Sequence, residues 1–189
     1  ALYSELFDGH IGTVLAAAQD EARTAQVEKA LQGGATFIQL REKNLDQDHF
    51  MEEALELKKL CAAYHVPFVI NDNVEIAAKM DADGVHVGQS DMEAGDVRAK
   101  LGPDKIIGVS AHNVAEAKKA FADGADYLGC GAMFPTHTKT DTNVISRQVL
   151  ADVCASVPIP VVAIGGIHKE NILPVSYTHL RAHETGAYL

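Results

Sequence analysis

The stretch DGVHVGQSD (residues 83–91) holds a short β-prone run, 84–87, that leads directly into glycine and polar side chains. A helical pattern follows over 92–101, and the same order precedes it, with a strand at 67–70 and a helix at 74–80. Short apolar strands separated by helices predict βαβ units and a parallel sheet. Because the strands read as continuous apolar runs, we expect both faces of the sheet to be buried.

The alternation continues on both sides of this stretch. The further elements are expected at 36–40 (strand), 46–64 (helix, with Asp46 as N-cap), 106–109 (strand), 114–122 (helix), 126–129 (strand), 146–156 (helix) and 160–164 (strand). Six small strands in series favour a barrel over a flat doubly wound sheet. A Rossmann fold would need G-x-G-x-x-G after the first strand, and no such motif is present.

Both ends of the chain depart from the pattern. Residues 1–25 form an atypical N-terminal segment without a recognisable strand, and Leu15–Leu31 reads as one helix. Residues 26–174 form the expected barrel domain. The tail 175–189 has no strand or helix periodicity and resembles a translated sequencing-library adapter, so it is set aside in assigning the fold. A (β/α)8 barrel usually needs ~250 residues, so 189 residues predict an incomplete barrel whose first and eighth strands are not recognisable.

Composition restricts the classes of function. With 16 basic and 26 acidic residues the formal net charge is -10, which disfavours nucleic acid and anionic lipid as partners. No apolar run approaches the ~18 residues that span a bilayer. Three cysteines without C-x-x-C spacing fit a reduced compartment, and no leader pattern opens the chain, so the cytoplasm is the expected location.

The residues just past the strands carry the candidate chemistry, because active sites of α/β barrels gather at the carboxyl ends of the strands. Asp72 and Asp91 follow two successive strands, where two carboxylates can share a Mg²⁺ ion with substrate phosphate oxygens. The alternative is that each aspartate caps the helix behind it.

Three cations, Arg41, Lys43 and Lys139, also follow strands and suit a phosphate group, although they could equally form a solvated rim. Gly165-Gly166 is either a phosphate cradle or a tight turn that requires positive φ. Ser110, Thr136 and Thr138 supply hydroxyls there or ordinary turn hydrogen bonds.

Other candidates are weaker. His86 lies in mid-strand and is interpreted as a core residue, since no second histidine lies at zinc-ligand spacing. Cys130 has no basic partner in the sequence and is not proposed as a nucleophile.

Together these strand ends resemble the thiamine phosphate synthase family over about residues 27–174. The matching runs, in the order and at the spacing of the family, are QLREK (39–43), INDN (70–73), DGVHVGQSD (83–91), IGVS (107–110), DYLGCG (126–131), FPTHTK (134–139) and VAIGGI (162–167).

The resemblance implies a TIM barrel transferase. It would join hydroxymethylpyrimidine pyrophosphate to thiazole phosphate and release thiamine phosphate and pyrophosphate, by a Mg²⁺-assisted dissociative substitution. Such a reaction needs charge stabilisation on the leaving group and alignment of the reactants, and no general base, because a neutral ring nitrogen attacks.

The resemblance also implies roles for individual residues. Asp72 and Asp91 match the Mg²⁺ ligands, and Lys139, Ser110 and Arg41 match catalytic positions. The substrate-binding positions are Gln39, Leu40, Arg41, Glu42, Lys43, Asn71, Ser110, Thr136, His137, Thr138, Lys139 and Gly166. Of these, the run from Thr136 to Thr138 and Gly166 match the thiazole-phosphate pocket.

Other interpretations stay open. A thiazole tautomerase-like barrel would not need the two aspartates, and epimerases or indole-pathway barrels would not explain THTK (136–139) together with Asn71-Asp72. A truncated phosphate-binding product without turnover is a third possibility, since loss of the first and eighth strands would expose two sheet edges and favour poor folding. The partners expected are small molecules, and a homo-oligomer is compatible with the sequence.

Overall fold

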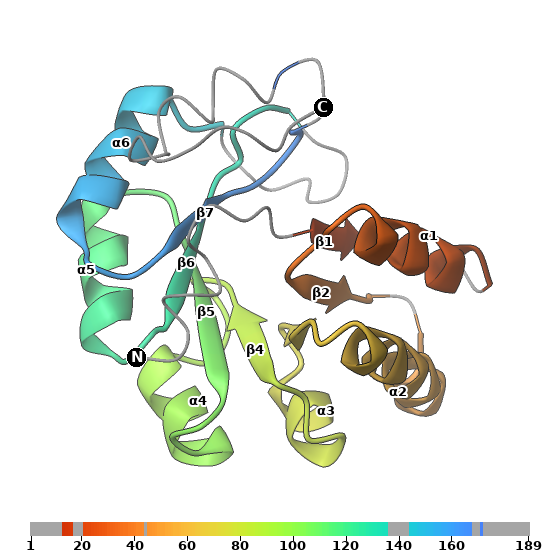
Figure 1. Cartoon of the computed structure of the whole chain (residues 1–189). Coiled ribbons are helices and arrows are strands. Elements are labelled where there is room, and N and C mark those ends of the chain that lie inside the picture. Colours follow the sequence, from red (N-terminus) through yellow and green to blue (C-terminus); the bar gives the residue numbers. More distant parts are fainter. Residues whose placement is uncertain (1–12, 17–20, 44, 136–143, 168–170, 172–189) are drawn as a thin grey trace.

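A computed structural model describes residues 13–16, 21–43, 45–135, 144–167 and 171. Strands and helices alternate along the chain and form one parallel sheet that curves, with the helices on its outer side (Figure 1). The elements are β1 (Thr13–Ala16), α1 (Glu21–Gln32), β2 (Ile38–Arg41), α2 (Gln47–Ala63), β3 (Phe68–Asn71), α3 (Val74–Lys79), β4 (Gly84–Val87), α4 (Ala94–Leu101), β5 (Ile106–Ala111), α5 (Val114–Ala122), β6 (Tyr127–Cys130), α6 (Arg147–Ser156) and β7 (Val161–Ala163).

The sheet has the order β1-β2-β3-β4-β5-β6-β7, and every neighbouring pair is parallel. The six strands expected from the sequence are confirmed, as are the helices between them. Asp46 caps α2 as expected, since its side chain accepts hydrogen bonds from the N–H groups of Asp48 and His49. This chain therefore folds as a parallel β/α barrel-type domain.

The N-terminal expectation was wrong on one point. The structure has a first strand, β1, within the segment 1–25, and the helix read over Leu15–Leu31 begins only at Glu21. A four-residue run such as TVLA (13–16) next to alanines does not distinguish strand from helix by its own periodicity. Parallel pairing with β2, which aligns Val14 with Gln39 and Ala16 with Arg41, decides for the strand. The expected absence of an eighth strand and the tail 175–189 lie outside the described residues.

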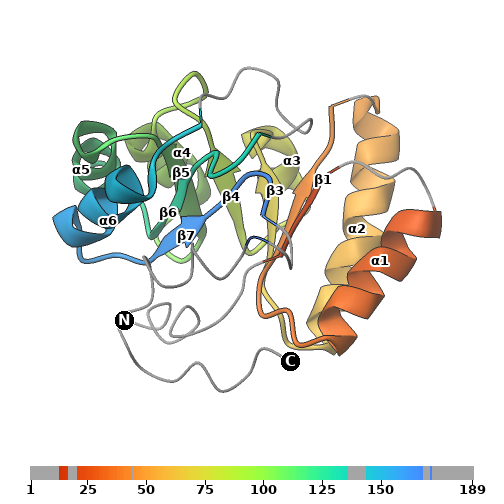
Figure 2. The ribbon, with the colours of Figure 1, turned by 90° about the horizontal axis from the view of Figure 1, so that it is seen from above.

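Two apolar layers hold the sheet. On the outer side, strand residues such as Leu40, Ile70 and Leu128 pack against helix residues such as Leu57 and Leu150, all at most 1% exposed. α1 and α2 lie side by side on one flank, and α5 and α6 cover the other (Figure 2). None of the described helices is long and apolar enough to span a membrane.

A second, smaller cluster fills the concave side of the sheet, with Phe37, Val69, Ile106 and Tyr127 buried together. The rings of Phe37 and Tyr127 meet edge to face, with centroids 5.3 Å apart. Phe37 immediately precedes β2 and Tyr127 begins β6, so this contact crosses three intervening strands. Such a contact requires the sheet to curl.

Glycine makes room for these large side chains. A Cβ atom on Gly108 would lie 2.1 Å from Cζ of Tyr127, and one on Gly129 would lie 2.8 Å from Cε1 of His86. The inner layer is thus filled by two rings seated against strands that carry no side chain at the point of contact.

We predict that Gly108→Ala destabilises the fold by about 1–3 kcal/mol, the usual range for overpacking a core, because the Tyr127 ring cannot move away from its buried site. Denaturant unfolding followed by circular dichroism measures this. Gly95→Ala is the matched control, since the nearest atom to its new Cβ, the Asp123 carbonyl oxygen, is 3.9 Å away. Equal stability of the Gly108 variant and the parent would contradict the packing described.

Candidate functional site

The carboxyl ends of the parallel strands meet at one mouth of the barrel. β2 ends at Arg41, β3 at Asn71 and β4 at Val87, while Ser110 lies one residue before the end of β5. The register places Asn71 beside His86, and Ser110 beside Gly129. Sequence positions that are far apart are therefore gathered at one edge, as the sequence predicts.

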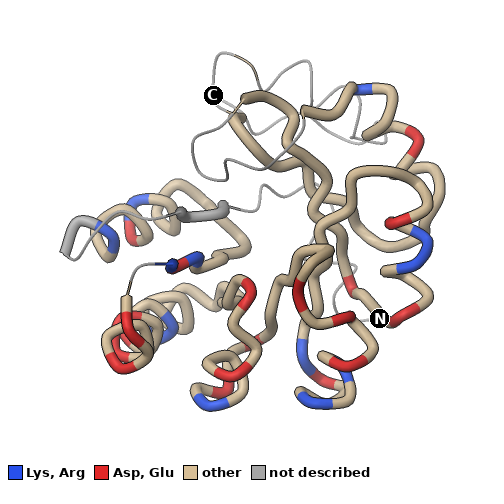
Figure 3. The backbone as a smooth tube through the Cα atoms, turned by 180° about the vertical axis from the view of Figure 1, so that it is seen from behind, with Lys and Arg blue, Asp and Glu red and all other residues tan. Residues whose placement is uncertain are grey.

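Acidic residues are spread over the outer helices and loops, where lysine and arginine are interspersed with them (Figure 3). Among the described residues, most acidic side chains thus lie on the outside of the barrel. Arg41 and Lys43 lie at the end of β2 and the start of the following loop, so their positive charge is local to the mouth.

His86 is a buried core residue, as interpreted from the sequence, and is 4% exposed. Its two ring nitrogens join two other strands: Nδ1 lies 2.9 Å from the Tyr127 hydroxyl and Nε2 lies 3.0 Å from Oγ of Ser110. Burial raises the pKa of Tyr127 and keeps its hydroxyl protonated. If Tyr127 donates to Nδ1, Nε2–H donates to Ser110, and the Ser110 proton is directed away from His86.

Sequence reasoning missed this connection. The signal was present, because Ile106 and Gly108 of β5 and Tyr127 and Gly129 of β6 alternate on one face of the sheet. A large ring such as Tyr127 opposite a glycine such as Gly108 is the pattern expected where one side chain fills the interior of a curved sheet. The identity of its partner, His86, depends on the curvature of the sheet.

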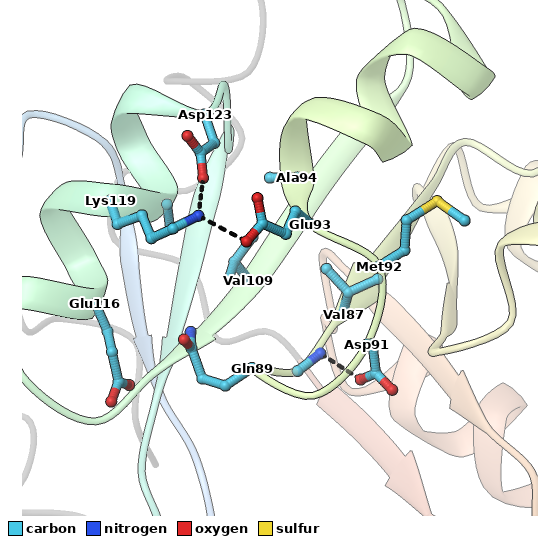
Figure 4. Close-up of a pocket in the computed structure, with 12 residues that line it drawn as sticks. Val87, Gln89, Asp91, Met92, Glu93, Ala94, Val109, Glu116, Lys119 and Asp123 are labelled. Atoms are coloured by element: carbon cyan, nitrogen blue, oxygen red, sulfur yellow. Dashed lines mark hydrogen bonds and ion pairs between the residues drawn. The ribbon is translucent and has the colours of Figure 1, made fainter.

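The loop after β4 fixes the other side of Ser110. Nε2 of Gln89 donates to the Ser110 carbonyl at 2.6 Å. Oδ2 of Asp91 accepts the N–H of Gly88 at 2.7 Å (Figure 4). A small pocket lies beside this loop, between α4 and α5. Its lysine, Lys119, is already paired with Glu93 and Asp123, and the hydrogen bond that Lys119 donates to Asp123 raises the Lys119 pKa. This pocket therefore lacks an uncommitted positive charge for a phosphate.

Neither aspartate at the strand ends caps the helix behind it. Helix α3 is capped by Asn73, whose Oδ1 accepts the N–H of Ile76 at 3.0 Å. Asp72 adopts a left-handed backbone conformation (φ 64°), and its N–H donates to the His86 carbonyl at 2.7 Å. At α4 the cap position is Glu93, which makes no side-chain capping bond. The capping alternative is therefore wrong for both Asp72 and Asp91.

The residues of the β2 strand end take three different orientations. Leu40 is fully buried among the helices, whereas Lys43 is exposed. Gln39 is 4% exposed, and its Nε2 has no hydrogen-bond partner among the described residues. A buried amide left in this state is rare in proteins and is accounted for where a ligand supplies the partner.

Glu42 points away from solvent. Its side chain is 4% exposed, and Oε2 pairs with Arg23 of α1 at 2.9 Å. Oε1 accepts the N–H of Lys43 at 2.6 Å and that of Leu45 at 3.3 Å. Its carboxylate thus stabilises the loop that carries Lys43.

Two further loops meet beside β7. Gly165 and Gly166 both have positive φ (89° and 67°), as a tight turn requires; positive φ is equally compatible with a phosphate cradle. A Cβ on Gly166 would lie 2.7 Å from the Pro135 carbonyl oxygen, and the N–H of Phe134 donates to the Gly165 carbonyl at 3.1 Å. The chain thus enters the stretch 136–139 from a position next to Gly166. Thr136, His137, Thr138 and Lys139 themselves lie outside the described residues.

The residues described do not bring three or more His, Cys, Asp or Glu side chains together as a metal cage would require. Two carboxylates, those of Asp72 and Asp91, instead follow the neighbouring strands β3 and β4, and carboxylates are among the ligands that Mg²⁺ shares with water and phosphate oxygens. The fold and this set of side chains define a class: parallel β/α barrel enzymes that act on phosphorylated small molecules.

Comparison with known proteins gives the particular family within that class. The family model described as thiamine monophosphate synthase matches residues 13–183. The chain belongs to this family, whose members are transferases of thiamine biosynthesis that condense hydroxymethylpyrimidine pyrophosphate with thiazole phosphate.

Individual relatives agree. A thiamine-phosphate synthase of Methanobrevibacter smithii is 51% identical over 145 residues, covering 77% of this chain and 69% of the relative. One of Clostridium botulinum is 52% identical over 146 residues, covering 77% and 68%. The solved thiamine phosphate pyrophosphorylase of Pyrococcus furiosus superposes with a TM-score of 0.81 at 38% identity, covering 92% of this chain and 83% of that one. An N-acetylmannosamine-6-phosphate 2-epimerase of Clostridium perfringens shares the fold alone, with a TM-score of 0.68 at 15% identity.

We predict that Tyr127→Phe weakens the support of Ser110 without removing the ring that fills the barrel. Loss of the hydroxyl leaves Nδ1 of His86 without this buried partner, which costs about 1–3 kcal/mol of stability. Urea unfolding measures the loss, and kcat for thiamine phosphate formation should fall with it. Tyr64→Phe, at an exposed residue after α2, should change neither quantity. Wild-type stability and kcat in Tyr127→Phe would contradict the prediction, because they would show that the hydroxyl does not support His86 and Ser110.

The cysteines should be inert in the folded protein. Burial raises the pKa of Cys61 and of Cys130 to about 12, so at pH 8 only about one thiol in ten thousand is the reactive thiolate. We predict that iodoacetamide at pH 8 labels these two residues only after urea is added, as measured by peptide mass spectrometry. Rapid labelling of Cys130 in the native protein would reopen it as a candidate nucleophile.

Proposed function

We propose that this chain carries out the reaction of its family at the carboxyl ends of its strands, with Mg²⁺ held by Asp72 and Asp91. The observation that carries the proposal is that these two carboxylates follow the adjacent, paired strands β3 and β4 and that neither caps a helix.

The pyrophosphate of the first substrate binds next to this pair. Arg41 and Lys43, from the end of β2, and Lys139, from the loop after β6, supply the positive charge that the leaving group requires. Arginine can form two parallel hydrogen bonds with a phosphate, whereas lysine acts as a point charge. Local cations of this kind allow an acidic protein to bind a highly charged anion.

The pyrimidine ring occupies the side of the mouth lined by Gln39, Asn71 and Ser110. The unpartnered Nε2 of Gln39 supports this placement, because a ring nitrogen of the pyrimidine can accept its hydrogen bond. The hydroxyl of Ser110, oriented by His86, can bond to the same ring. These contacts orient the methylene carbon at which substitution takes place.

The thiazole phosphate binds at the loops beside β7. The positive φ of Gly166, and the chain that enters 136–139 beside it, support a pocket in which backbone N–H groups and the hydroxyls of Thr136 and Thr138 receive the phosphate. His137 lies between them in the sequence. Because β5, β6 and β7 are neighbours in the sheet, this phosphate lies close enough to Ser110 for the two substrates to meet at the mouth.

The reaction follows a dissociative course. The bond between the pyrimidine methylene and pyrophosphate breaks, and the thiazole nitrogen then bonds to the pyrimidine-methyl cation. When bound, Mg²⁺ supplies positive charge to the pyrophosphate oxygens. Arg41 and Lys139 stabilise the charge that develops on the leaving group, and Ser110 and Gln39 hold the ring in line. No side chain has to remove a proton for the new bond to form.

The partners are thus two small phosphorylated molecules and a magnesium ion. The three cysteines are free thiols, which supports the cytoplasm as the place of action.

A product assay tests the proposal. The purified chain is incubated with both substrates and Mg²⁺, and thiamine phosphate is quantified by chromatography. Product that disappears with EDTA and returns with Mg²⁺ is the expected result. Rearrangement of the thiazole without metal would favour a tautomerase-like enzyme, and pyrophosphate binding without product would favour a binding protein; either result contradicts the proposal.

We predict that Asp72→Asn and Asp91→Asn each lower kcat/KM by about 100-fold or more, the scale of losing one charge-stabilising group. The Mg²⁺ concentration for half-maximal rate should rise as well. Asp81→Asn is the matched control: Asp81 also has positive φ (53°), but it lies at the opposite end of the barrel, before β4, and pairs with Lys105. An equal loss in the Asp81 variant would show that the effect does not depend on metal binding at the mouth of the barrel.

A further inference from the structure

We propose that Arg23 of helix α1 is a positioning residue for the pyrophosphate site, because it holds the Glu42 carboxylate inside the protein and away from the anionic substrate. The proposal rests on the assignment of Arg41 and Lys43 to the pyrophosphate group. Arg23 precedes the barrel core in sequence, and the motif that signals the site begins only at Gln39.

Arg23 forms a buried ion-pair cluster with Glu42 and with Glu53, and this cluster links α1 to α2. The arginine side chain is 3% exposed and pairs with Glu42, whose side chain is 4% exposed, and with Glu53 of α2, whose side chain is 16% exposed. One cation thus faces two carboxylates. Buried ion pairs of this kind add little stability over apolar residues of the same size, so stability alone does not account for this one.

The position of Glu42 in the sequence explains why this ion-pair cluster is useful. It lies between Arg41 and Lys43, so a carboxylate directed to the mouth would compete with pyrophosphate for both cations and repel the substrate. Arg23 binds Oε2 instead, while Oε1 accepts the N–H groups of Lys43 and Leu45. The two oxygens thereby fix the loop in a form in which Lys43 remains exposed.

Removal of the guanidinium should release Glu42. An unpaired carboxylate is costly to bury, so Glu42 moves towards solvent and towards Arg41 and Lys43. The affinity for the pyrophosphate substrate then falls. A second substitution that removes the charge of Glu42 should restore much of that affinity, because an amide at residue 42 can still accept the loop N–H bonds without attracting the lysine.

The test compares Arg23→Gln with the double variant Arg23→Gln/Glu42→Gln. We expect Arg23→Gln to raise KM for the pyrimidine pyrophosphate about tenfold or more, with less than a twofold change in KM for thiazole phosphate. The double variant should recover most of the lost affinity. Calorimetric titration with magnesium pyrophosphate gives the same comparison without turnover.

Arg98→Gln is the matched control for a merely structural role. Arg98 also ties a helix to loops, through Asp126 at 2.6 Å and the carbonyl groups of Lys105 and Gly124, but at the opposite end of the barrel. It should lower the melting temperature and leave KM for both substrates unchanged. If Arg23→Gln does not fold, Arg23→Lys replaces it, since lysine keeps the charge but cannot bind two carboxylates in the same planar geometry.

Arg41→Ala separates this inference from the proposed function. If Arg41→Ala leaves the affinity for pyrophosphate unchanged, the assignment of the site itself is wrong. If Arg41→Ala weakens binding but Arg23→Gln does not, or if the double variant is as weak as Arg23→Gln, Arg23 acts only on stability and the inference is overturned.

Discussion

The packing of two rings inside the curved sheet is the constraint on which the other features depend. Tyr127 and His86 occupy the concave side where Gly108 and Gly129 present no side chain, and Tyr127 reaches Phe37 across the sheet. Once these rings are in place, His86 lies against Ser110. The interior that gives the sheet its curvature thus also orients a hydroxyl at its mouth, so the same side chains fill the core and position Ser110.

The parallel topology of the sheet brings the other site residues together at one edge. Every strand runs in the same direction, so the residue that follows each strand arrives at the same edge, whatever its distance along the chain. In the proposed site, that geometry lets a protein with net charge -10 hold an anionic substrate, because cations such as Arg41 and Lys43 follow a strand end. It also creates a difficulty, because Glu42 lies between two of those cations. Its pairing with Arg23 shows how a helix outside the barrel can stabilise the loop of the site.

Much of the fold could be predicted from the sequence, because local patterns decide it. The apolar runs that form β2 to β7 were long enough to be recognised. Asp46 indicated the start of α2, which it caps. β1 could not be recognised, because four residues beside alanines fit either structure and only pairing with β2 decides. Asp72 and Asp91 were found as candidates from their positions after strands. Whether they cap helices could not be read from the sequence, since Asn73 stands next to Asp72 and is an equally good cap.

The sequence by itself determined the parallel β/α architecture, the family and the set of polar residues at the strand ends, because these follow from periodicity and from residue types at fixed spacing. The tertiary structure decided how those residues are used. It turned Glu42 inward onto Arg23 and left Nε2 of Gln39 buried without a hydrogen-bond partner among the described residues. It also joined His86 to Ser110 and Tyr127. These are contacts between residues 19 to 41 positions apart, and no local pattern records them, since they exist only once the sheet has curled and the helices have packed around it.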